Sequence, residues 1–248
     1  MSKIKLILLI VISIILTNCN TDKHKFPIDK RYWTTKDYVS VIYEFRYGYK
    51  SDEKLPTFDD PKNRIIVEKL TDQQNFAIIL DDNELGIKHR NDVAESFFMR
   101  WKDMHNIYQA VDRKDKYIYD KEMLAVWQFG LGLQLKYFKL GNDNVIKNAD
   151  DPESSYTKNS VNSNVNTLIK NYLIYLDEIN NENALSEEGI RIFAEGIDIY
   201  FAQLVELYPN ANYSGMENKI ELMQKKSNSE SIKNSLKKLK NLIESKKS

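Results

Sequence analysis

Three carboxylates in the C-terminal half, Glu195, Asp198 and Glu206, have the type and spacing that could support acid–base chemistry. Glu195 and Asp198 are three residues apart, so a helix places both on one face. Two carboxylates on one face can act as general acid and general base in hydrolysis. The simpler interpretation is a solvated helix face, because spacing alone does not place these side chains in a cleft.

Histidine and glycine patterns of known enzyme sites are missing from the sequence. The three histidines, at 24, 89 and 105, form neither a Glu-x-x-His pair nor an HExxH motif, the patterns of di-iron and zinc sites. The eight glycines do not fall at the spacings of a P-loop, a GxGxxG turn or a nucleophile elbow. We therefore expect no catalytic residue, no metal and no cofactor of these kinds, and we interpret His105 as a packing residue beside an aromatic stripe.

The only cysteine, Cys19, follows the layout of a secretory signal peptide. Lys3 and Lys5 precede an apolar run over residues 6–16, and the chain becomes polar directly after Cys19. The run is about half the roughly 20 apolar residues that a spanning helix needs, so a short membrane anchor is the weaker alternative. A single cysteine cannot form an intramolecular disulfide. The sequence predicts a signal peptide over residues 1–18.

The residues Leu16-Thr17-Asn18-Cys19 resemble the lipobox of bacterial lipoproteins, of the Bacteroidota type, although Asn18 stands where Gly, Ala or Ser is usual. This resemblance implies cleavage before Cys19 and acylation of that residue, which would attach the chain to a membrane. Residues 20–25 lack the acidic cluster of surface-exported lipoproteins of this type. We expect a domain of the bacterial cell envelope that faces the periplasm, with residues 19–32 as the lipid tether.

Composition favours helices and gives no indication of a nucleic-acid partner. Lys and Arg number 36, as do Asp and Glu, so the formal charge is zero and the chain has no overall basic field. Only 8 glycines and 5 prolines occur in 248 residues, which indicates long helices rather than a many-stranded fold. Residues 219–248 are locally basic, with nine lysines against three glutamates. This amphipathic segment either packs its apolar side and solvates its lysines or docks on anionic lipid.

Capping signals predict where several helices begin. Thr34 with Asp37 forms a capping pair, and Trp33 can pack on Tyr38 as a hydrophobic staple. Ser186 predicts the start of a helix that ends at Pro209. Asn91 predicts the start of a helix with an aromatic stripe that runs to residue 108.

The most apolar segment, residues 123–138, is expected to be the central helix. Gly130 and Gly132 lower its helix propensity, so we expect them to permit the close approach of a neighbouring helix. Residues 141–164 are rich in Asn, Asp and Ser, which predicts a long loop and a possible subdomain boundary. A further helix is expected over residues 165–179.

Aromatic residues make up 11% of the chain, and most fall on the expected core stripes. We expect Tyr43, Tyr47, Tyr117 and Tyr119 to be exposed and to contact a partner, because tyrosine is enriched in interfaces.

We expect an all-α domain over residues 33–248, an irregular helical bundle or short α-solenoid of about seven or eight helices. A tethered helical domain without these enzyme motifs resembles the immunity lipoproteins of Bacteroidota. The resemblance rests on the lipobox, the Trp33-Thr34 start and the aromatic all-α body. It implies neutralisation of a cognate interbacterial toxin by occlusion. The alternatives are an envelope accessory lipoprotein that binds glycan, peptide or cell-wall material, and a hydrolase that uses carboxylates alone.

Overall fold

Over the residues that the structure describes, the protein is all-α, with about eight helices, as the sequence predicts. A computed structural model describes residues 23–82, 84–109, 111–112 and 116–247. The signal peptide expected over residues 1–18 and Cys19 therefore lie outside the described residues. The strands are β1 (Val111–Asp112) and β2 (Lys116–Tyr117), which pair antiparallel with Val111 opposite Tyr117.

The helices differ widely in length, and three of them continue into turns of another kind. The N-terminal helices are α2 (Thr35–Tyr43), continued by the π-helical turn η1 (Glu44–Gly48), α3 (Arg64–Thr71), α4 (Gln74–Leu80) and α5 (Ile87–Tyr108). The central pair is α6 (Asp120–Lys147) and α7 (Ser155–Leu176), which runs into the 3-10 turns of η2 (Asp177–Ala184). The C-terminal helices are α8 (Glu187–Gly196), joined through the π-helical turn η3 (Ile197–Phe201) to α9 (Ala202–Leu207), then α10 (Ser214–Lys226) and α11 (Glu230–Lys246).

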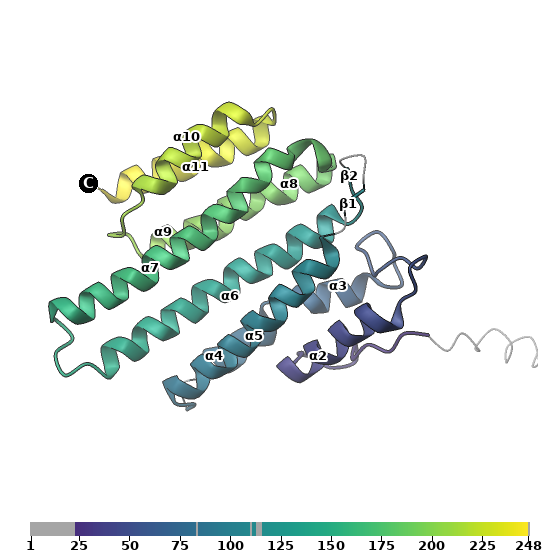
Figure 1. The fold of residues 1–248 in the computed structure, drawn as a ribbon, viewed down its shortest axis with the longest axis horizontal. Helices are drawn as coiled ribbons and strands as arrows, with labels where there is room; N and C mark the ends of the chain where they lie inside the picture. Colours follow the sequence, from purple (N-terminus) through teal and green to yellow (C-terminus); the bar gives the residue numbers. More distant parts are fainter. Residues whose placement is uncertain (1–22, 83, 110, 113–115, 248) are drawn as a thin grey trace, which may run out of the picture.

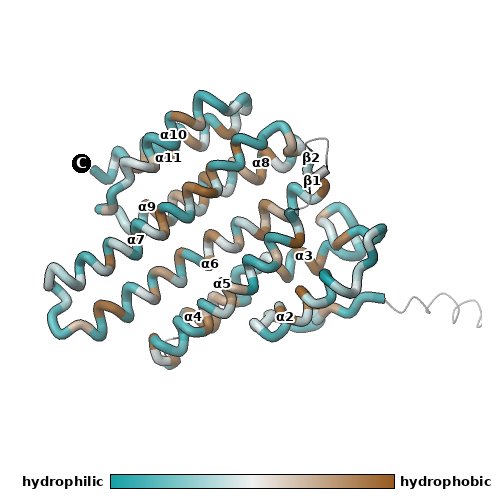
Figure 2. Tube along the Cα trace, in the orientation of Figure 1, coloured by the Kyte–Doolittle hydropathy of each residue, from teal (hydrophilic) through white to brown (hydrophobic). Residues whose placement is uncertain are grey.

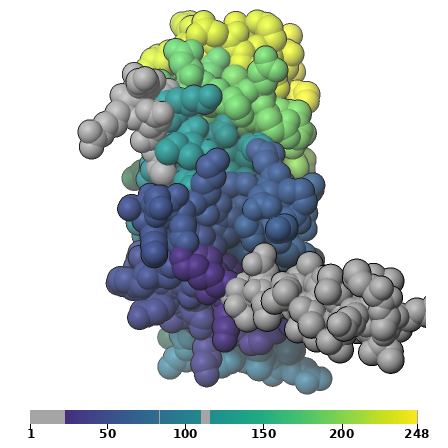
Figure 3. Space-filling view, turned by 90° about the vertical axis from the view of Figure 1, so that its right-hand side faces the viewer, coloured from purple at the N-terminus to yellow at the C-terminus, as the bar shows by residue number. Residues whose placement is uncertain are grey.

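The elements stack across the molecule roughly in chain order (Figure 1). Helix α6 lies between α5 and α7, and α11 packs on α8 and η3. In Figure 3 the colours change from purple and blue at one end of the molecule to yellow at the other. The arrangement is that of an irregular helical bundle.

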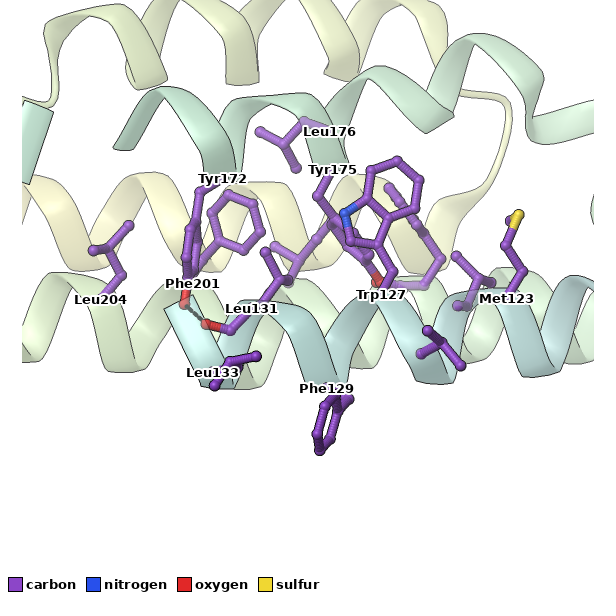
Figure 4. Packing of buried hydrophobic residues seen from close by; sticks show 14 of the residues in the cluster. Met123, Trp127, Phe129, Leu131, Leu133, Tyr172, Tyr175, Leu176, Phe201 and Leu204 are labelled. Atoms are coloured by element: carbon purple, nitrogen blue, oxygen red, sulfur yellow. Dashed lines mark hydrogen bonds between the residues drawn. The ribbon is translucent and has the colours of Figure 1, made fainter. Parts of the chain in front are cut away.

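Helix α6 is buried on most sides because its sequence is apolar around the whole helix. Phe129 packs against Tyr38 and Phe76 on one side, whereas Leu131 faces α7 on the other, where its carbonyl accepts the Tyr172 hydroxyl at 2.8 Å (Figure 4). The other helices show the alternation of hydrophilic and hydrophobic residues that is typical of amphipathic helices (Figure 2). The expectation of a central helix over residues 123–138 is confirmed.

The long loop predicted over residues 141–164 is wrong. Helix α6 continues to Lys147 and α7 begins at Ser155, so the connection covers only residues 148–154. Asn142 is buried between the helices, where its side chain donates to the Tyr208 hydroxyl at 3.2 Å and accepts from Asn164 at 2.9 Å. Tertiary hydrogen bonds thus satisfy polar side chains that sequence composition assigns to a loop.

The predicted helix starts are confirmed at two caps and wrong at two others. Thr34 and Asp37 form the full capping box, and the Ser186 hydroxyl accepts the Gly189 N–H at 3.0 Å. Helix α5 begins at Ile87, before Asn91, because Gly86 supplies the extended residue at its start. Helix α7 begins ten residues before the expected position 165, with Ser154 as its cap.

The lysine-rich C-terminal segment packs its apolar side against the rest of the domain. This is the first of the two arrangements that the sequence allowed, the other being docking on anionic lipid. The side chains of Ile232, Leu236, Leu239 and Ile243 are buried. Six of the nine lysines pair with carboxylates: Lys219–Asp177, Lys233–Glu230, Lys238–Asp198, Lys240–Glu221, Lys246–Glu206 and Lys247–Glu217. Internal acids therefore neutralise most of the local positive charge. Among the described residues, no helix is both long and apolar enough to span a bilayer.

Candidate functional site

Tyr43 and Tyr47 form an exposed aromatic pair where α2 passes into η1. Their side chains are 64% and 71% exposed, and their ring centroids lie 4.8 Å apart at a 47° tilt. Val39, also exposed, lies one turn before Tyr43 on the same side of the helix. We call Val39, Tyr43 and Tyr47 the tyrosine face. The structure leaves these two tyrosines exposed, as the sequence predicts.

The cap and the staple fix the direction of the helix that carries this face. Asp37 accepts the backbone N–H of Thr34 at 2.9 Å, and Thr34 accepts that of Asp37 at 3.4 Å. The Trp33 ring packs edge-on against Tyr38 with centroids 5.8 Å apart. Since both contacts lie in the first turn, α2 starts at one defined position and angle.

The π-helical turn η1 is held from two sides. Phe45 is buried against Tyr108, with ring centroids 5.8 Å apart, and Arg46 pairs with Asp103 of α5 at 2.9 Å. A Cβ on Gly48 would overlap the Glu44 carboxylate, so glycine leaves room for that side chain. Single π turns often occur at functional sites, so the position of Tyr47 in η1 favours a functional role for the tyrosine face.

The described part of the tether expected over residues 19–32 is not a free linker, because residues 23–33 pack along α2 and η1. The His24 ring stacks on Tyr49 with centroids 3.8 Å apart, and its Nδ1 lies 2.7 Å from Glu44 Oε1. Phe26 packs against Phe45, with centroids 5.3 Å apart. We call residues 23–33 the N-terminal strip. Its His and Phe side chains gain tertiary contacts that a count of polar residues does not show.

Tyr117 and Tyr119 are not exposed, so this part of the expected surface is wrong. Tyr117 is 7% exposed, because β2 packs on η2 and brings its hydroxyl to Glu178. Burial and that carboxylate raise the pKa of Tyr117. Tyr119 is half-buried, its ring packs edge-on against Tyr108, and its hydroxyl accepts the Leu55 N–H at 3.2 Å. These two tyrosines hold loops in place.

The three carboxylates singled out from the sequence all lie in ion pairs. Glu195 pairs with Arg191 one turn away, Asp198 with Lys238 at 2.8 Å, and Glu206 with Lys246 at 2.8 Å. Glu195 and Asp198 share a shallow groove of about 600 Å³ between α8–η3 and α11, which Asn234 and Asn241 also line. Ion pairs on a shallow groove fit an exposed polar surface better than an enclosed catalytic site.

His105 packs among aromatic rings, as the sequence predicts. Its ring lies edge-on to Trp127, with centroids 4.8 Å apart, and 6.0 Å from Trp101. Burial lowers the pKa of His105 to about 4, so the ring is neutral at pH 7. Within the described ranges, no group of three or more His, Cys, Asp or Glu side chains could hold a metal ion.

Two buried carboxylates of α6 accept hydrogen bonds from neighbouring loops, and the sequence analysis identified neither of them. Asp120 accepts the backbone N–H of Ser186 at 2.7 Å and its hydroxyl at 2.6 Å. Glu122 accepts the Phe58 N–H at 2.7 Å, and burial raises the pKa of its carboxyl. Their partners lie 64 and 66 residues away, so no local pattern marks them.

No protein-family model, curated protein or solved structure matches this chain.

Proposed function

We propose that this chain is a lipid-anchored periplasmic binding protein whose partner is another protein. The observation that carries the proposal is the exposed Tyr43–Tyr47 pair on a helix fixed by Thr34 and Arg46. Tyrosine supplies large contact area at low cost in side-chain entropy and is enriched among residues that dominate binding energy. The rigid support beneath the pair favours a preformed interface over one that orders on binding.

The partner class that we propose is a toxin delivered by a neighbouring cell, which the chain would neutralise by covering its active surface. This part of the proposal rests on the resemblance to immunity lipoproteins. An occluding protein needs a stable surface and no catalytic groups of its own. The ion-paired state of Glu195, Asp198 and Glu206 is compatible with that role.

Co-purification of residues 20–248 with the products of neighbouring genes tests the proposal. We expect one product to be toxic to cells and to form a stable complex that abolishes its toxicity. The double variant Tyr43→Ala/Tyr47→Ala should weaken the complex by about tenfold or more, with an unchanged melting temperature because both side chains are exposed. The control is Tyr156→Ala, since Tyr156 is 82% exposed at the start of α7.

Two results would contradict different parts of the proposal. If no neighbouring product binds and exported protein fails to rescue cells, the toxin-neutralising function is wrong. If the complex forms with full affinity in the double variant, the function stands but the tyrosine face is not the interface.

A second candidate function is the binding of glycan, peptide or cell-wall material. The polar groove between α8–η3 and α11 favours it, because amide and hydroxyl side chains such as Asn234, Asn241 and Ser231 line that groove. Purified peptidoglycan should then retain the protein, and Asn234→Leu should reduce the retained fraction. Muralytic activity on a zymogram, lost in Glu195→Gln, would instead indicate the carboxylate hydrolase.

A further inference from the structure

The N-terminal strip is the part of the described structure that lies closest along the chain to Cys19. Lys23 follows Cys19 by four residues, and fully extended chain spans at most about 3.5 Å per residue. If Cys19 carries lipid, the Cα atom of Lys23 lies within about 14 Å of the Cα atom of the acylated residue. The strip is therefore held next to the bilayer.

The strip and the first two residues of α2 carry an excess of positive charge. Residues 23–36 contain five cations, Lys23, Lys25, Lys30, Arg31 and Lys36, against one acid, Asp29. Glu53 pairs with Lys23 and Asp37 with Lys30. Among the described residues, no carboxylate lies within 4.0 Å of the charged groups of the remaining three cations, which are all exposed.

Other features of the strip suit an interface with lipid headgroups. Ile28 is 39% exposed beside these cations, and the Arg31 guanidinium lies 5.1 Å from the centre of the Tyr32 ring. Lys69 of α3 donates to the backbone carbonyls of Lys30 at 2.6 Å and Arg31 at 3.0 Å, which adds a further cation and holds the strip in place. Basic side chains around an apolar one are typical of surfaces that sit on anionic membranes.

We propose that the N-terminal strip lies on an anionic phospholipid bilayer next to the acylated cysteine and fixes the orientation of the domain. This inference rests on the lipid anchor of the proposed function. Asp37 and Glu44, which bind the strip, lie about 100–120° around α2 from Tyr43. A bilayer against the strip thus leaves the tyrosine face to the side, open to a partner. The α6–α7 connection lies at the left end of the long axis in Figure 1, far from the purple N-terminal strip on the right.

Fluorophores attached to single engineered cysteines can measure this orientation. The full chain is produced in a bacterium, and the acylated protein is reconstituted into phosphatidylcholine vesicles with about 30% phosphatidylglycerol and nitroxide-labelled lipid. Because acylation occupies Cys19 and no other cysteine exists, Ile28→Cys, Tyr43→Cys and Tyr156→Cys are labelled one at a time. We expect strong quenching at 28, weaker quenching at 43 and none at 156. Equal quenching at all three, or the strongest quenching at 43, would overturn the proposal.

Charge reversal tests the electrostatic part with a matched control. Lys25→Glu/Arg31→Glu should abolish the preferential quenching at 28, as should vesicles of phosphatidylcholine alone. Lys225→Glu/Lys237→Glu reverses two exposed lysines of α10 and α11 and should leave the quenching unchanged. Preferential quenching that survives reversal in the strip would overturn the proposed role of its cations.

Mass spectrometry of the purified chain separates failure of this inference from failure of the anchor. A chain without acyl groups on Cys19 would contradict both the anchor and the orientation that depends on it. An acylated chain without preferential quenching at 28 would contradict the orientation alone.

Discussion

His105 shows at the residue scale how burial couples one side chain to the pH dependence of folding. Its Nε2 atom is buried without a hydrogen-bond partner among the described residues, next to the Trp127 ring. Burial lowers the pKa of His105 from 6.5 to about 4. Between these values the unfolded chain binds a proton that the folded chain does not. Protonation of His105 in the unfolded chain therefore leaves the free energy of unfolding unchanged above pH 6.5. It lowers that free energy by about 3 kcal/mol as the pH falls to about 4.

Replacement of His105 by phenylalanine should remove this pH dependence. The Phe ring can keep the contact with Trp127 and has no nitrogen to desolvate, so stability at pH 7 should be equal or about 1 kcal/mol higher. Urea unfolding at pH 7 and pH 4.5 checks the prediction through the difference between wild type and variant. His89→Gln, at an exposed position, is the control and should follow the wild-type pH profile. A His105→Phe variant with the same pH profile as wild type would show that His105 is not protonated on unfolding.

At the scale of one element, α6 contains glycines with opposite surroundings. A Cβ on Gly130 would overlap the Trp101 indole, whose Nε1 donates to the Val126 carbonyl at 2.7 Å. A Cβ on Gly141 would meet only Asn91 Oδ1, at 3.9 Å. Gly130 therefore allows α5 and α6 to approach closely, whereas Gly141 only lowers helix propensity.

Alanine substitutions at these two glycines should have effects of opposite sign. Gly130→Ala should lower the free energy of unfolding by about 1–3 kcal/mol, because the indole must move. Gly141→Ala should raise it by about 0.5–1 kcal/mol, because alanine restricts the unfolded chain. Chemical denaturation of both variants measures the difference. Equal effects in the two variants would contradict the close approach of α5 and α6.

At the scale of the whole molecule, one hydrophobic cluster extends from Trp33 to Ile243. It passes from α2 through α5, α6 and α7 to α11 without a break at residues 141–164. The three tryptophans, Trp33, Trp101 and Trp127, all lie on or before α6, whereas helical content is spread over the chain. Fluorescence and circular dichroism therefore report different parts of the same cluster.

A cavity in α11 should destabilise both halves of the molecule together. Leu236 is fully buried, so Leu236→Ala should cost about 2–5 kcal/mol. We expect tryptophan fluorescence and far-ultraviolet circular dichroism to shift to one common, lower denaturation midpoint. The control is Lys237→Ala, at the exposed residue next to Leu236, which should change the midpoint little. A fluorescence midpoint unchanged by Leu236→Ala would show that the C-terminal helices unfold independently.

The candidate surface was only partly predictable from the sequence. Tyr43 follows a clear cap at Thr34 and lies on the polar side of an amphipathic helix, so its exposure follows from helical periodicity. Tyr117 lies in a two-residue strand whose packing on η2 is set by contacts about 60 residues away in sequence. Local pattern therefore predicted the first tyrosine correctly and the second wrongly.

The sequence by itself determined the helical class, the central helix and the capped starts at Thr34 and Ser186, because periodicity and capping act within one or two turns. Only the tertiary structure decided the length of α6, the path of the N-terminal strip and the partners of the C-terminal lysines. Asn142 lies within a helix because Tyr208 and Asn164 form hydrogen bonds with its side-chain amide. Lys238 pairs with Asp198, which lies forty residues away in sequence. Such contacts depend on which distant polar groups the packed core brings within hydrogen-bond distance, and local sequence does not record them.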